Sequence, residues 1–423
     1  MNWQFNRISV VGLGYIGLPT AAMFASRKIH VVGIDVSEHA VETINQGKVH
    51  IVEPDLDIAV HSAVSQGYLR ATTTPEPADA FLIAVPTPFK GDDHDPDLSY
   101  IEAACRSIAP VLAPGNLVVL ESTSPVGTTE KMSAWLAEAR PDLSFPHRSG
   151  EASDVRVAHC PERVLPGKVM QELIQNDRVI GGITPACSDA ALSLYSLFVK
   201  GECVVTDART AEMAKLTENA FRDVNIAFAN ELSLICDRLD INVWELIALA
   251  NRHPRVNILQ PGPGVGGHCI AVDPWFIVSS APDVSRLIRA TREVNDGKPD
   301  WVLEKVDAAV AQWSMRSGGS AGEVTVACYG LAFKPDIDDL RESPALYIAE
   351  QLQERFGERL VVIEPNIDGL PVSLDRCHFG SAADIAADIH VLLVDHREFK
   401  AMAVPKGLIV DTRGVWTGVR GAA

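Results

Sequence analysis

A glycine-rich segment past the middle of the chain carries the residues best suited to covalent chemistry. In the segment NRHPRVNILQPGPGVGGHCIAVDPW, residues 251–275, a stretch with four glycines at 262–267 immediately precedes His268 and Cys269, and Asp273 follows four residues after Cys269. A cysteine on such a closely approachable backbone, next to a basic group, is a candidate thiolate nucleophile. We expect the other seven cysteines to be packing or surface residues: Cys105, Cys160, Cys187, Cys203, Cys236, Cys328 and Cys377.

A second chemical signal lies at the amino terminus. The β-branched run 8–11 leads into Gly12, Gly14 and Gly17 and then into a helical pattern. A further apolar run ends at Asp35, eighteen residues beyond Gly17. This spacing predicts a dinucleotide site, in which the glycines let the pyrophosphate approach a helix amino end and the acid accepts a hydrogen bond from the ribose. An acid at this position favours NAD over NADP, because a carboxylate repels a 2′-phosphate.

An NAD site and a nucleophilic thiol in one chain imply a four-electron oxidation. Removal of a hydride from a primary alcohol gives an aldehyde, which the thiolate of Cys269 traps as a thiohemiacetal. A second hydride transfer gives a thioester, and water releases the carboxylate. Such chemistry also needs a proton acceptor, oxyanion donors and a carboxylate that positions water.

The remaining elements must position these groups. Apolar strands at 80–86 and 116–123 end near Thr87 and Thr123, and ligands of open α/β sheets bind beyond such strand ends. The same two threonines could equally serve only to end their strands and cap the next elements.

A long helical pattern without internal glycine or proline runs from Thr206 to about Leu239. A polar stripe on this helix holds Lys215, Asn219 and Arg222, and it is either a solvated face or part of a site. We expect an apolar stripe to face the core, made of Met213, Leu216, Ala220, Val224, Ala227 and Leu234.

Strand patterns return after a Ser/Gly-rich segment at 317–323, without a second dinucleotide turn. The expected fold is therefore α/β, with two Rossmann-like doubly wound domains joined by a long central helix. We expect an NAD-binding domain at 1–205, a central helical domain with the cysteine loop at 206–316, and a second doubly wound domain at 317–423 that binds a nucleotide-bearing substrate.

Composition limits the partners. The chain of 423 residues has a net charge of −18, which disfavours nucleic acid and anionic membranes as partners. No apolar run reaches the roughly 18 residues of a membrane span, and no signal-peptide pattern opens the chain. Scattered cysteines without a Cys-x-x-Cys pair favour reduced thiols, a cytoplasmic location and no metal site.

Long segments in a fixed order resemble the UDP-glucose/GDP-mannose dehydrogenase family. They include VVGLGYIGLPTA, AVPTPFKG, ESTSPVGTTEKM, CPERVLPGK, TAEMAKLTENAFRDVNIAFANELSLIC, the cysteine loop and GLAFKPDIDDLRESPA, and together they cover essentially the whole chain. The resemblance implies NAD-dependent oxidation of the C6 hydroxyl of a UDP-sugar for surface polysaccharide biosynthesis, by a homodimer built on the long helix. It thereby implies that 206–316 is the dimerisation domain and that 317–423 is the UDP-sugar-binding domain. It favours UDP-N-acetylmannosamine as the substrate, with UDP-N-acetylglucosamine or UDP-glucose left open.

The resemblance also implies roles for individual residues. Cys269 corresponds to the nucleophile, Lys215 to the general acid/base, Asn219 to an oxyanion donor, and Asp273, Glu162 and Thr123 to groups around the reacting carbon and water. NAD contacts correspond to Gly12, Gly14, Tyr15, Ile16, Gly17, Asp35, Thr87, Thr129 and Arg341. Substrate contacts correspond to Arg163, Val164, Lys215, Asn219, Arg222, His253, Arg255, Gly266, Phe333 and Lys334. The cations among these are expected to form a basic cleft in an acidic protein.

Two other classes of function remain open on the sequence. A two-electron β-hydroxyacid-type dehydrogenase shares the dinucleotide domain, the long helical region and a catalytic lysine with a nearby asparagine, but it needs no thiol. A non-catalytic NAD-dependent sensor or scaffold would not require Lys215, Asn219, Cys269 and Asp273 together.

Overall fold

The structure is a computed structural model that describes residues 3–91, 94–165, 167–267, 269–381 and 385–417. The chain divides into two compact units. The first unit comprises residues 1–218 and 275–282, and the second comprises residues 219–274 and 283–423. Each unit contains its own parallel sheet.

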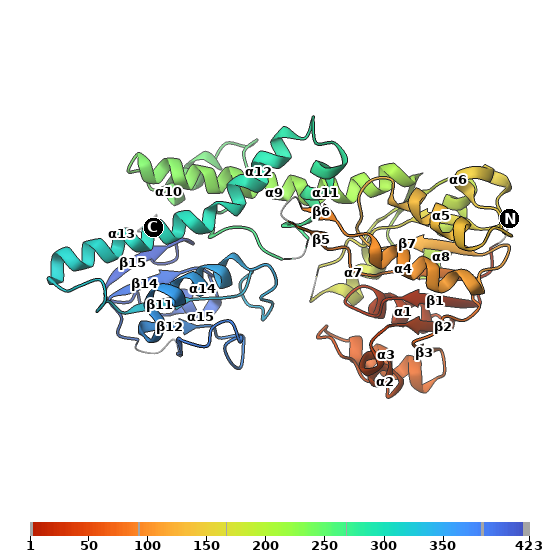
Figure 1. The fold of residues 1–423 in the computed structure, drawn as a ribbon, viewed down its shortest axis with the longest axis horizontal. Helices are drawn as coiled ribbons and strands as arrows, with labels where there is room; N and C mark the ends of the chain where they lie inside the picture. The colour runs from red at the N-terminus through yellow and green to blue at the C-terminus, as the bar shows by residue number, and fades with distance from the viewer. Residues whose placement is uncertain (1–2, 92–93, 166, 268, 382–384, 418–423) are drawn as a thin grey trace. The chain divides into compact units, whose positions relative to one another are not determined.

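The first unit is built on an eight-stranded sheet of order β10-β9-β8-β7-β4-β1-β2-β3. Figure 1 labels β1, β2, β3 and β7 of this sheet. Its neighbouring strands are parallel except for the antiparallel pair β8 and β9. The chain leaves β1 towards β2 on one side and later returns to β4 on the other, so the strand order reverses between β1 and β4, where open α/β sheets bind ligands. The strands are β1 (Arg7–Val11), β2 (His30–Ile34), β3 (Leu69–Thr72), β4 (Ala80–Ile83), β7 (Leu117–Leu120), β8 (Arg156–His159), β9 (Arg178–Gly182) and β10 (Cys203–Asp207).

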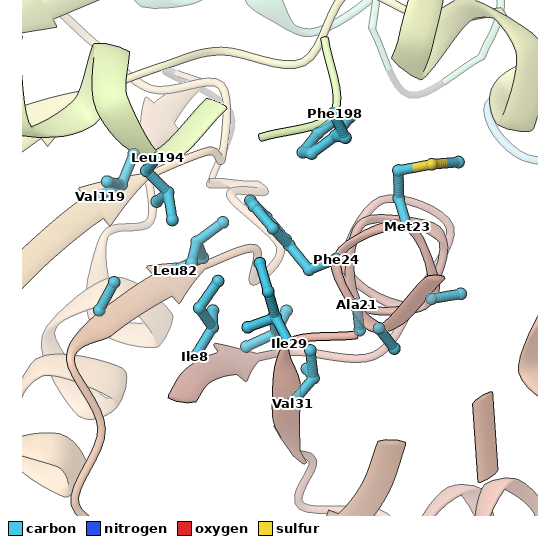
Figure 2. Close-up of a cluster of buried hydrophobic side chains, with 14 of the residues drawn as sticks. Ile8, Ala21, Met23, Phe24, Ile29, Val31, Leu82, Val119, Leu194 and Phe198 are labelled. Atoms are coloured by element: carbon cyan, nitrogen blue, oxygen red, sulfur yellow. The ribbon is translucent and has the colours of Figure 1, made fainter. Parts of the chain in front are cut away.

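Helices cover both faces of this sheet. On one face, Ile8, Leu82 and Val119 pack with Phe24 and Leu194, as Figure 2 shows. On the other face, alternate residues of the same strands pack against α4 and α5. The helices of this unit are α1 (Gly17–Ser26), α2 (Glu38–Asn45), α3 (Leu56–Ser65), α4 (Ser99–Ile108), α5 (Thr128–Ala139), α6 (Pro146–Ser149), α7 (Val169–Gln175) and α8 (Pro185–Tyr195), and β5 (Phe89–Lys90) pairs with β6 (Asp95–Pro96) as a short antiparallel ribbon.

The long helix α9 (Ala208–Arg238) has 31 residues and confirms the predicted central helix. The predicted first residues, Thr206 and Asp207, instead end strand β10. The expectation of an apolar buried stripe is wrong for Met213, whose side chain is exposed, whereas Leu216, Ala220 and Ala227 are buried as expected. The buried residues of α9 include a polar set, namely Glu212, Lys215, Asn219, Asp223, Asn230 and Ser233.

The second unit contains a five-stranded parallel sheet of order β13-β12-β11-β14-β15. Residues of α13 and α14 share a core with one face of this sheet, and Tyr329 and Phe399 pack on the other face. Its strands are β11 (Val326–Tyr329), β12 (Leu360–Ile363), β13 (His378–Phe379), β14 (Ile389–Leu392) and β15 (Leu408–Asp411), and its remaining helices are α10 (Val243–Ala250), α12 (Arg286–Asp296), α13 (Lys298–Ser317), α14 (Pro344–Phe356) and α15 (Arg397–Ala401). Helix α11 (Asp273–Ser280) begins in this unit and ends in the first.

The predicted fold class is confirmed by the two parallel sheets with helices on both faces and by the long helix α9. Strand β13 was not predicted, because it has only two residues and both are exposed. No helix in the described part of the chain is long and apolar enough to cross a membrane.

Candidate active site

The glycine turn between β1 and α1 has the geometry that a pyrophosphate needs. A Cβ atom on Gly12 would lie 2.4 Å from the carbonyl oxygen of Ala84, and one on Gly17 would lie 1.8 Å from the carbonyl oxygen of Gly12. Gly14 has nothing within 4 Å of its Cβ position. The first and third glycines therefore serve the turn and its packing, while the second leaves space above the backbone for a ligand. Tyr15 and Ile16, predicted to contact NAD, lie in the same turn.

Asp35 follows β2 and is tied to this turn. Its Oδ2 accepts a hydrogen bond from the backbone N–H of Leu13 at 2.9 Å, and its Oδ1 accepts one from Ser37 at 2.9 Å. Each carboxylate oxygen has a second lone pair, so a ribose hydroxyl can still donate to the group. The open position at Gly14 and the acid at Asp35 thus fit an NAD molecule.

Thr87 and Thr123 lie together at the carboxyl ends of β4 and β7. The hydroxyl of Thr87 donates to the backbone carbonyl of Thr123 at 2.6 Å. The structure therefore places both residues at the strand ends named by the sequence, on the NAD side of the sheet.

Thr129 is held by a glutamate that the sequence analysis missed. Its hydroxyl donates to Oε1 of Glu212 at 2.5 Å and its backbone N–H donates to the same oxygen at 2.7 Å, while Gly127 N–H donates to Oε2 at 2.6 Å. Glu212 thus caps the start of α5 from the neighbouring helix α9. Thr129 is fully buried, so its direct contact with NAD stays a prediction.

Glu162 lies just beyond β8 and forms a buried ion pair with Arg178 of β9, at 2.9 Å between Oε2 and Nη1. Its other oxygen accepts a hydrogen bond from the backbone N–H of Arg163. The Arg163 guanidinium in turn pairs with Glu218 of α9 at 2.5 Å. Val164 packs against the core of the first unit. The sequence analysis did not predict Arg178 as a partner of Glu162. The signal that could have indicated it is an arginine at the start of the otherwise apolar strand RVIGG.

A buried glutamate lies behind this pair. The hydroxyl of Tyr195 donates to Oε1 of Glu121 at 2.7 Å, and the Arg178 guanidinium lies over the Tyr195 ring, 5.1 Å from its centre. Burial raises the pKa of Glu121 to about 7, although the charge of Arg178 opposes the shift. The interior near Glu162 is therefore polar and only partly neutralised.

Lys215 lies on α9 near the end of the first unit. Its side chain is almost fully buried, and no described carboxylate lies within ion-pair distance of its ammonium group. The role of Lys215 as the general acid/base stays a prediction.

Asn219, one helical turn later, contacts the predicted water-activating carboxylate. Its Nδ2 donates to Oδ2 of Asp273, the first residue of α11, at 2.5 Å. Its Oδ1 accepts a hydrogen bond from the guanidinium of Arg222. The backbone carbonyl of Cys269 accepts the N–H of Asp273 at 2.8 Å, so these four predicted residues form one cluster.

The loop with Cys269 packs on the segment between β11 and α14. The N–H of Gly267 donates to the carbonyl of Arg341 at 3.2 Å, and a Cβ on Gly266 would lie 2.8 Å from Cβ of Phe333. Only glycine allows this approach. The Arg341 side chain pairs with Asp339 at 2.6 Å.

Lys334 lies in the same neighbourhood. Burial lowers its pKa, and the nearby positive charge of Arg222 lowers it further, whereas Cys269 and Asp339 act in the opposite direction. Arg222, Cys269 and Lys334 are thus close enough to influence one another. Arg222 and Lys334 are two cations of the expected basic cleft that lie near each other within the second unit.

His253 and Arg255 lie in an exposed turn after α10. Asn251 closes this turn, since its side chain donates to the carbonyl of Ile258 at 3.0 Å and accepts the Ile258 N–H at 2.7 Å. The structure gives neither His253 nor Arg255 a contact with the other predicted site residues. His268 lies outside the described residues.

Gly262, Gly264 and Gly267 repeat the spacing of Gly12, Gly14 and Gly17. Here, however, no strand precedes the glycines among residues 239–261, and a Cβ on Gly264 would lie 2.9 Å from Pro344. The second glycine is covered rather than open, so this segment is a packed loop and not a pyrophosphate turn.

The segment after β11 is held like the glycine turn of the NAD domain, by an acid that follows the neighbouring strand and accepts a backbone N–H. Glu364 follows β12 as Asp35 follows β2, and its Oε2 accepts the N–H of Leu331 at 2.7 Å. The same oxygen lies 3.0 Å from Nε2 of His396, whose Nδ1 accepts the N–H of Asp336 at 2.9 Å. Burial opposes ionisation of Glu364, but these hydrogen bonds outweigh it and lower its pKa to about 2. Glu364 and His396 therefore fix both ends of the loop that carries Phe333 and Lys334, and sequence reasoning missed both.

Family models match the chain along most of its length. The NAD binding domain of the UDP-glucose/GDP-mannose dehydrogenase family matches residues 6–199, the central domain matches 209–297, and the UDP binding domain matches 327–418. The chain belongs to the UDP-glucose/GDP-mannose dehydrogenase family and is an NAD-dependent UDP-sugar dehydrogenase.

The chain is also similar to individual dehydrogenases of known substrate name. The chain is 66% identical to a UDP-N-acetyl-D-mannosamine dehydrogenase of Yersinia pestis over 98% of its own length and 100% of the relative. It is 64% identical to an NDP-N-acetyl-D-galactosaminuronic acid dehydrogenase of Ralstonia nicotianae over 99% of its length and 98% of the relative. Among solved structures it is similar to a UDP-D-ManNAc dehydrogenase from Pyrococcus horikoshii, with 40% identity, a TM-score of 0.83, and coverage of 97% of this chain and 96% of that one.

Proposed function

We propose that this protein oxidises the C6 hydroxyl of UDP-N-acetyl-D-mannosamine to the carboxylate of UDP-N-acetyl-D-mannosaminuronate, with two NAD⁺ consumed per sugar. The observation that carries the proposal is the cluster of Cys269, Asp273, Asn219 and Arg222 on one glycine-rich loop and one face of α9. A two-electron dehydrogenase has no use for the thiol, and a non-catalytic sensor would not require these residues together.

In this mechanism Lys215 takes the proton of the C6 hydroxyl as the alcohol is oxidised. NAD, when bound, would supply the hydride acceptor for each oxidation of C6. The Cys269 thiolate adds to the aldehyde carbon, and Asn219 stabilises the resulting oxyanion with the amide hydrogen that does not bond Asp273. After the second oxidation, Asp273 orients the water that attacks the thioester, with Glu162 and Thr123 beside the reacting carbon.

Binding roles follow the same assignments. The cofactor is held by Gly12, Gly14, Tyr15, Ile16, Gly17, Asp35, Thr87, Thr129 and Arg341. The substrate is held by Arg163, Val164, Lys215, Asn219, Arg222, His253, Arg255, Gly266, Phe333 and Lys334. Cations on this list neutralise the substrate pyrophosphate. The match of the three family models at 6–199, 209–297 and 327–418 supports the division of labour among domains 1–205, 206–316 and 317–423.

The mechanism is tested by product analysis with Cys269→Ser. We expect the wild type to form two NADH and one uronate per sugar. Cys269→Ser should lose acid formation by at least about 10³-fold while it still binds NAD. Cys203→Ser, at another partly buried cysteine, is the matched control and should behave as wild type. One NADH per sugar, unaffected by Cys269→Ser, would instead indicate the two-electron alternative.

The sugar is tested by steady-state comparison of UDP-sugars. The relatives named for N-acetyl-D-mannosamine support that epimer, and the relative named for N-acetyl-D-galactosaminuronic acid makes the galacto epimer a second candidate. We expect kcat/KM to be highest for UDP-N-acetylmannosamine. A higher value for the galacto, gluco or non-acetylated sugar nucleotide contradicts the assignment of substrate but leaves the chemistry intact.

We also propose that the protein is a homodimer. We expect it to work in the cytoplasm, in surface polysaccharide biosynthesis. Helix α9 exposes large apolar side chains at seven-residue intervals, Phe221, Phe228 and Ile235, and Phe221 is 68% exposed. Such a row on a long helix is suited to pair with a second copy of itself. Phe228→Glu should convert the dimer to a monomer in light scattering, whereas Val284→Glu, at an exposed residue outside α9, should not. A wild-type monomer contradicts the assignment.

A further inference from the structure

The loop that carries Cys269 is fastened at both ends to buried side chains. At its start, the N–H of Gly262 donates to Oδ1 of Asn230 at 2.9 Å. At its end, the carbonyl of Ile270, the residue after Cys269, accepts a hydrogen bond from Nη1 of Arg292 at 3.3 Å. Asn230 lies on α9 and Arg292 on α12, so two helices hold Gly262 and Ile270.

The two fastening points are connected to each other. Nδ2 of Asn230 donates to Oδ1 of Asn295 at 2.9 Å, and Nδ2 of Asn295 donates to Oδ1 of Asp223 at 2.7 Å. The same Asp223 oxygen accepts from Nη1 of Arg292 at 2.7 Å. An unbroken series of hydrogen bonds thus runs from Gly262 through α9 and α12 to Ile270.

This network is buried throughout. Arg292 is 1% exposed and is the largest fully buried side chain in the described part of the chain, and Asp223 and Asn230 have no exposed surface. Burial raises the pKa of Asp223 to about 6, while Arg292 and Asn295 oppose the shift. A buried ion pair is weak evidence for stability, since apolar residues often replace one without loss. What an apolar side chain could not do is hold the Ile270 carbonyl.

We propose that Arg292 is a positioning residue for the Cys269 nucleophile. Its guanidinium donates through Nη1 to Asp223 of α9 and to the carbonyl beside Cys269, and through Nη2 to Asp296 of its own helix. A lysine ammonium, with all its donors on one nitrogen, does not reproduce this planar arrangement. Asp223 lies one helical turn after Asn219, the residue that contacts Asp273. Helix α9 therefore sets the thiol through Arg292 and the water-activating carboxylate through Asn219. This inference rests on the proposed role of Cys269.

The proposal predicts a selective effect on the chemistry. The first oxidation does not use the thiol. The second requires a new bond between Sγ and C6 of the aldehyde, with the aldehyde oxygen receiving a proton, before the next hydride leaves. A displacement of about 1 Å in a reacting group costs about 10²-fold in rate. Loss of Arg292 should therefore slow acid formation much more than aldehyde formation, whereas general destabilisation would slow both equally.

The test is single turnover of the full chain with NAD⁺ and UDP-N-acetylmannosamine, with the aldehyde trapped as an oxime. Arg292→Met should slow acid formation about 10²-fold and aldehyde formation by less than 10-fold, and Arg292→Lys should lie between Arg292→Met and the wild type. Arg289→Met, at an exposed arginine of the same helix, is the matched control and should match wild type. Equal losses in both steps for Arg292→Met, or wild-type acid formation, overturns the proposal.

A second variant keeps the test decisive if Arg292→Met does not fold. Asn230→Ala removes the bond to Gly262 without leaving a buried charge, and should slow acid formation about 10-fold more than aldehyde formation. An unchanged ratio of the two rates in folded Asn230→Ala overturns the positioning role. Acid formation by Cys269→Ser overturns the role of Cys269 and this inference with it. If Cys269→Ser is inactive and the ratio is unchanged in the other variants, the positioning inference alone fails.

Discussion

The side-chain amide of Asn219 donates a hydrogen bond to the carboxylate of Asp273, with Nδ2 and Oδ2 2.5 Å apart. The Arg222 guanidinium donates to the other end of the same amide, so its orientation is fixed. A residue expected only to stabilise an oxyanion thus also holds the start of α11 against α9.

Removal of this amide tests both roles together. Asn219→Ala should lower kcat about 10²- to 10³-fold, the usual loss for an oxyanion donor, and leave the Kd for NAD within a few-fold of wild type because the glycine turn lies in the first unit. Asn225→Ala, on the same helix and bonded to the backbone of Phe221, is the control in the same kinetic assay. A kcat of Asn219→Ala within twofold of wild type would refute the assignment.

The glycine turn predicts opposite effects for two similar substitutions. Gly17→Ala should prevent correct folding of the first unit, because its Cβ would lie 1.8 Å from a backbone oxygen. Gly14→Ala meets nothing in the protein and should keep the melting temperature, yet weaken NAD binding at least about 10-fold by filling the space for the pyrophosphate. Thermal melting and fluorescence titration with NAD distinguish the two. Unchanged NAD affinity of Gly14→Ala would place the cofactor elsewhere.

The buried pair of Glu162 and Arg178 predicts a strongly non-additive double-mutant cycle. Arg178→Met alone leaves a buried carboxylate without its partner and should cost about 3–5 kcal/mol of unfolding free energy. The double variant Arg178→Met with Glu162→Gln should cost less than Arg178→Met alone. Arg209→Met breaks the exposed pair with Glu130 and should cost no more than about 1 kcal/mol. Chemical denaturation measures all three, and additive losses would contradict the account.

Lys298 predicts a dependence of stability on pH. Its ammonium is buried on α13, donates to the hydroxyl of Ser233 at 2.5 Å and lies 3.5 Å from the centre of the Trp301 ring. Burial lowers its pKa to about 7 from the ordinary 10.5. Between these values the unfolded chain binds a proton that the folded chain does not, so this group adds stability as pH rises from about 7 to 10.5.

The measurement compares melting temperatures of the wild type and Lys298→Met. The difference, wild type minus variant, should become more positive from pH 7 to pH 10. Lys406→Met, at an exposed lysine of the same unit, should show no such trend. A constant difference for Lys298→Met would show that the amine titrates normally.

Local patterns predicted most of the fold. The β-branched runs, the glycine turn and the absence of glycine and proline from α9 each depend on neighbours in sequence, and the structure confirms those elements. Likewise, Thr87 and Thr123 were correctly placed at adjacent strand ends, since parallel strands align their carboxyl ends at one edge.

The residues that sequence reasoning missed act over long separations. Arg292 and Asp223 are 69 residues apart, and Glu212 reaches Thr129 across 83 residues. Helix α9 buries many of its polar residues because loops and neighbouring helices supply hydrogen-bond partners that periodicity does not reveal. The same helix exposes the apolar side chains of Met213 and Phe221. A single sequence fixes the spacing of such residues but not which distant element satisfies them.

The acids at the ends of β2 and β12 differ in one respect with a kinetic consequence. Among the described residues, the Asp35 carboxylate accepts hydrogen bonds only from backbone N–H groups, whereas the Glu364 carboxylate also pairs with the side chain of His396. The assignment of Asp35 as the acid that accepts a hydrogen bond from the cofactor ribose stays a prediction, and these contacts are compatible with it. Under the proposed function, one cofactor site would serve both oxidations, so NADH would have to leave it and a second NAD⁺ bind there between the two steps. The covalent bond at Cys269 then retains the half-oxidised sugar during that exchange, so the thiol determines the order of events as well as the chemistry.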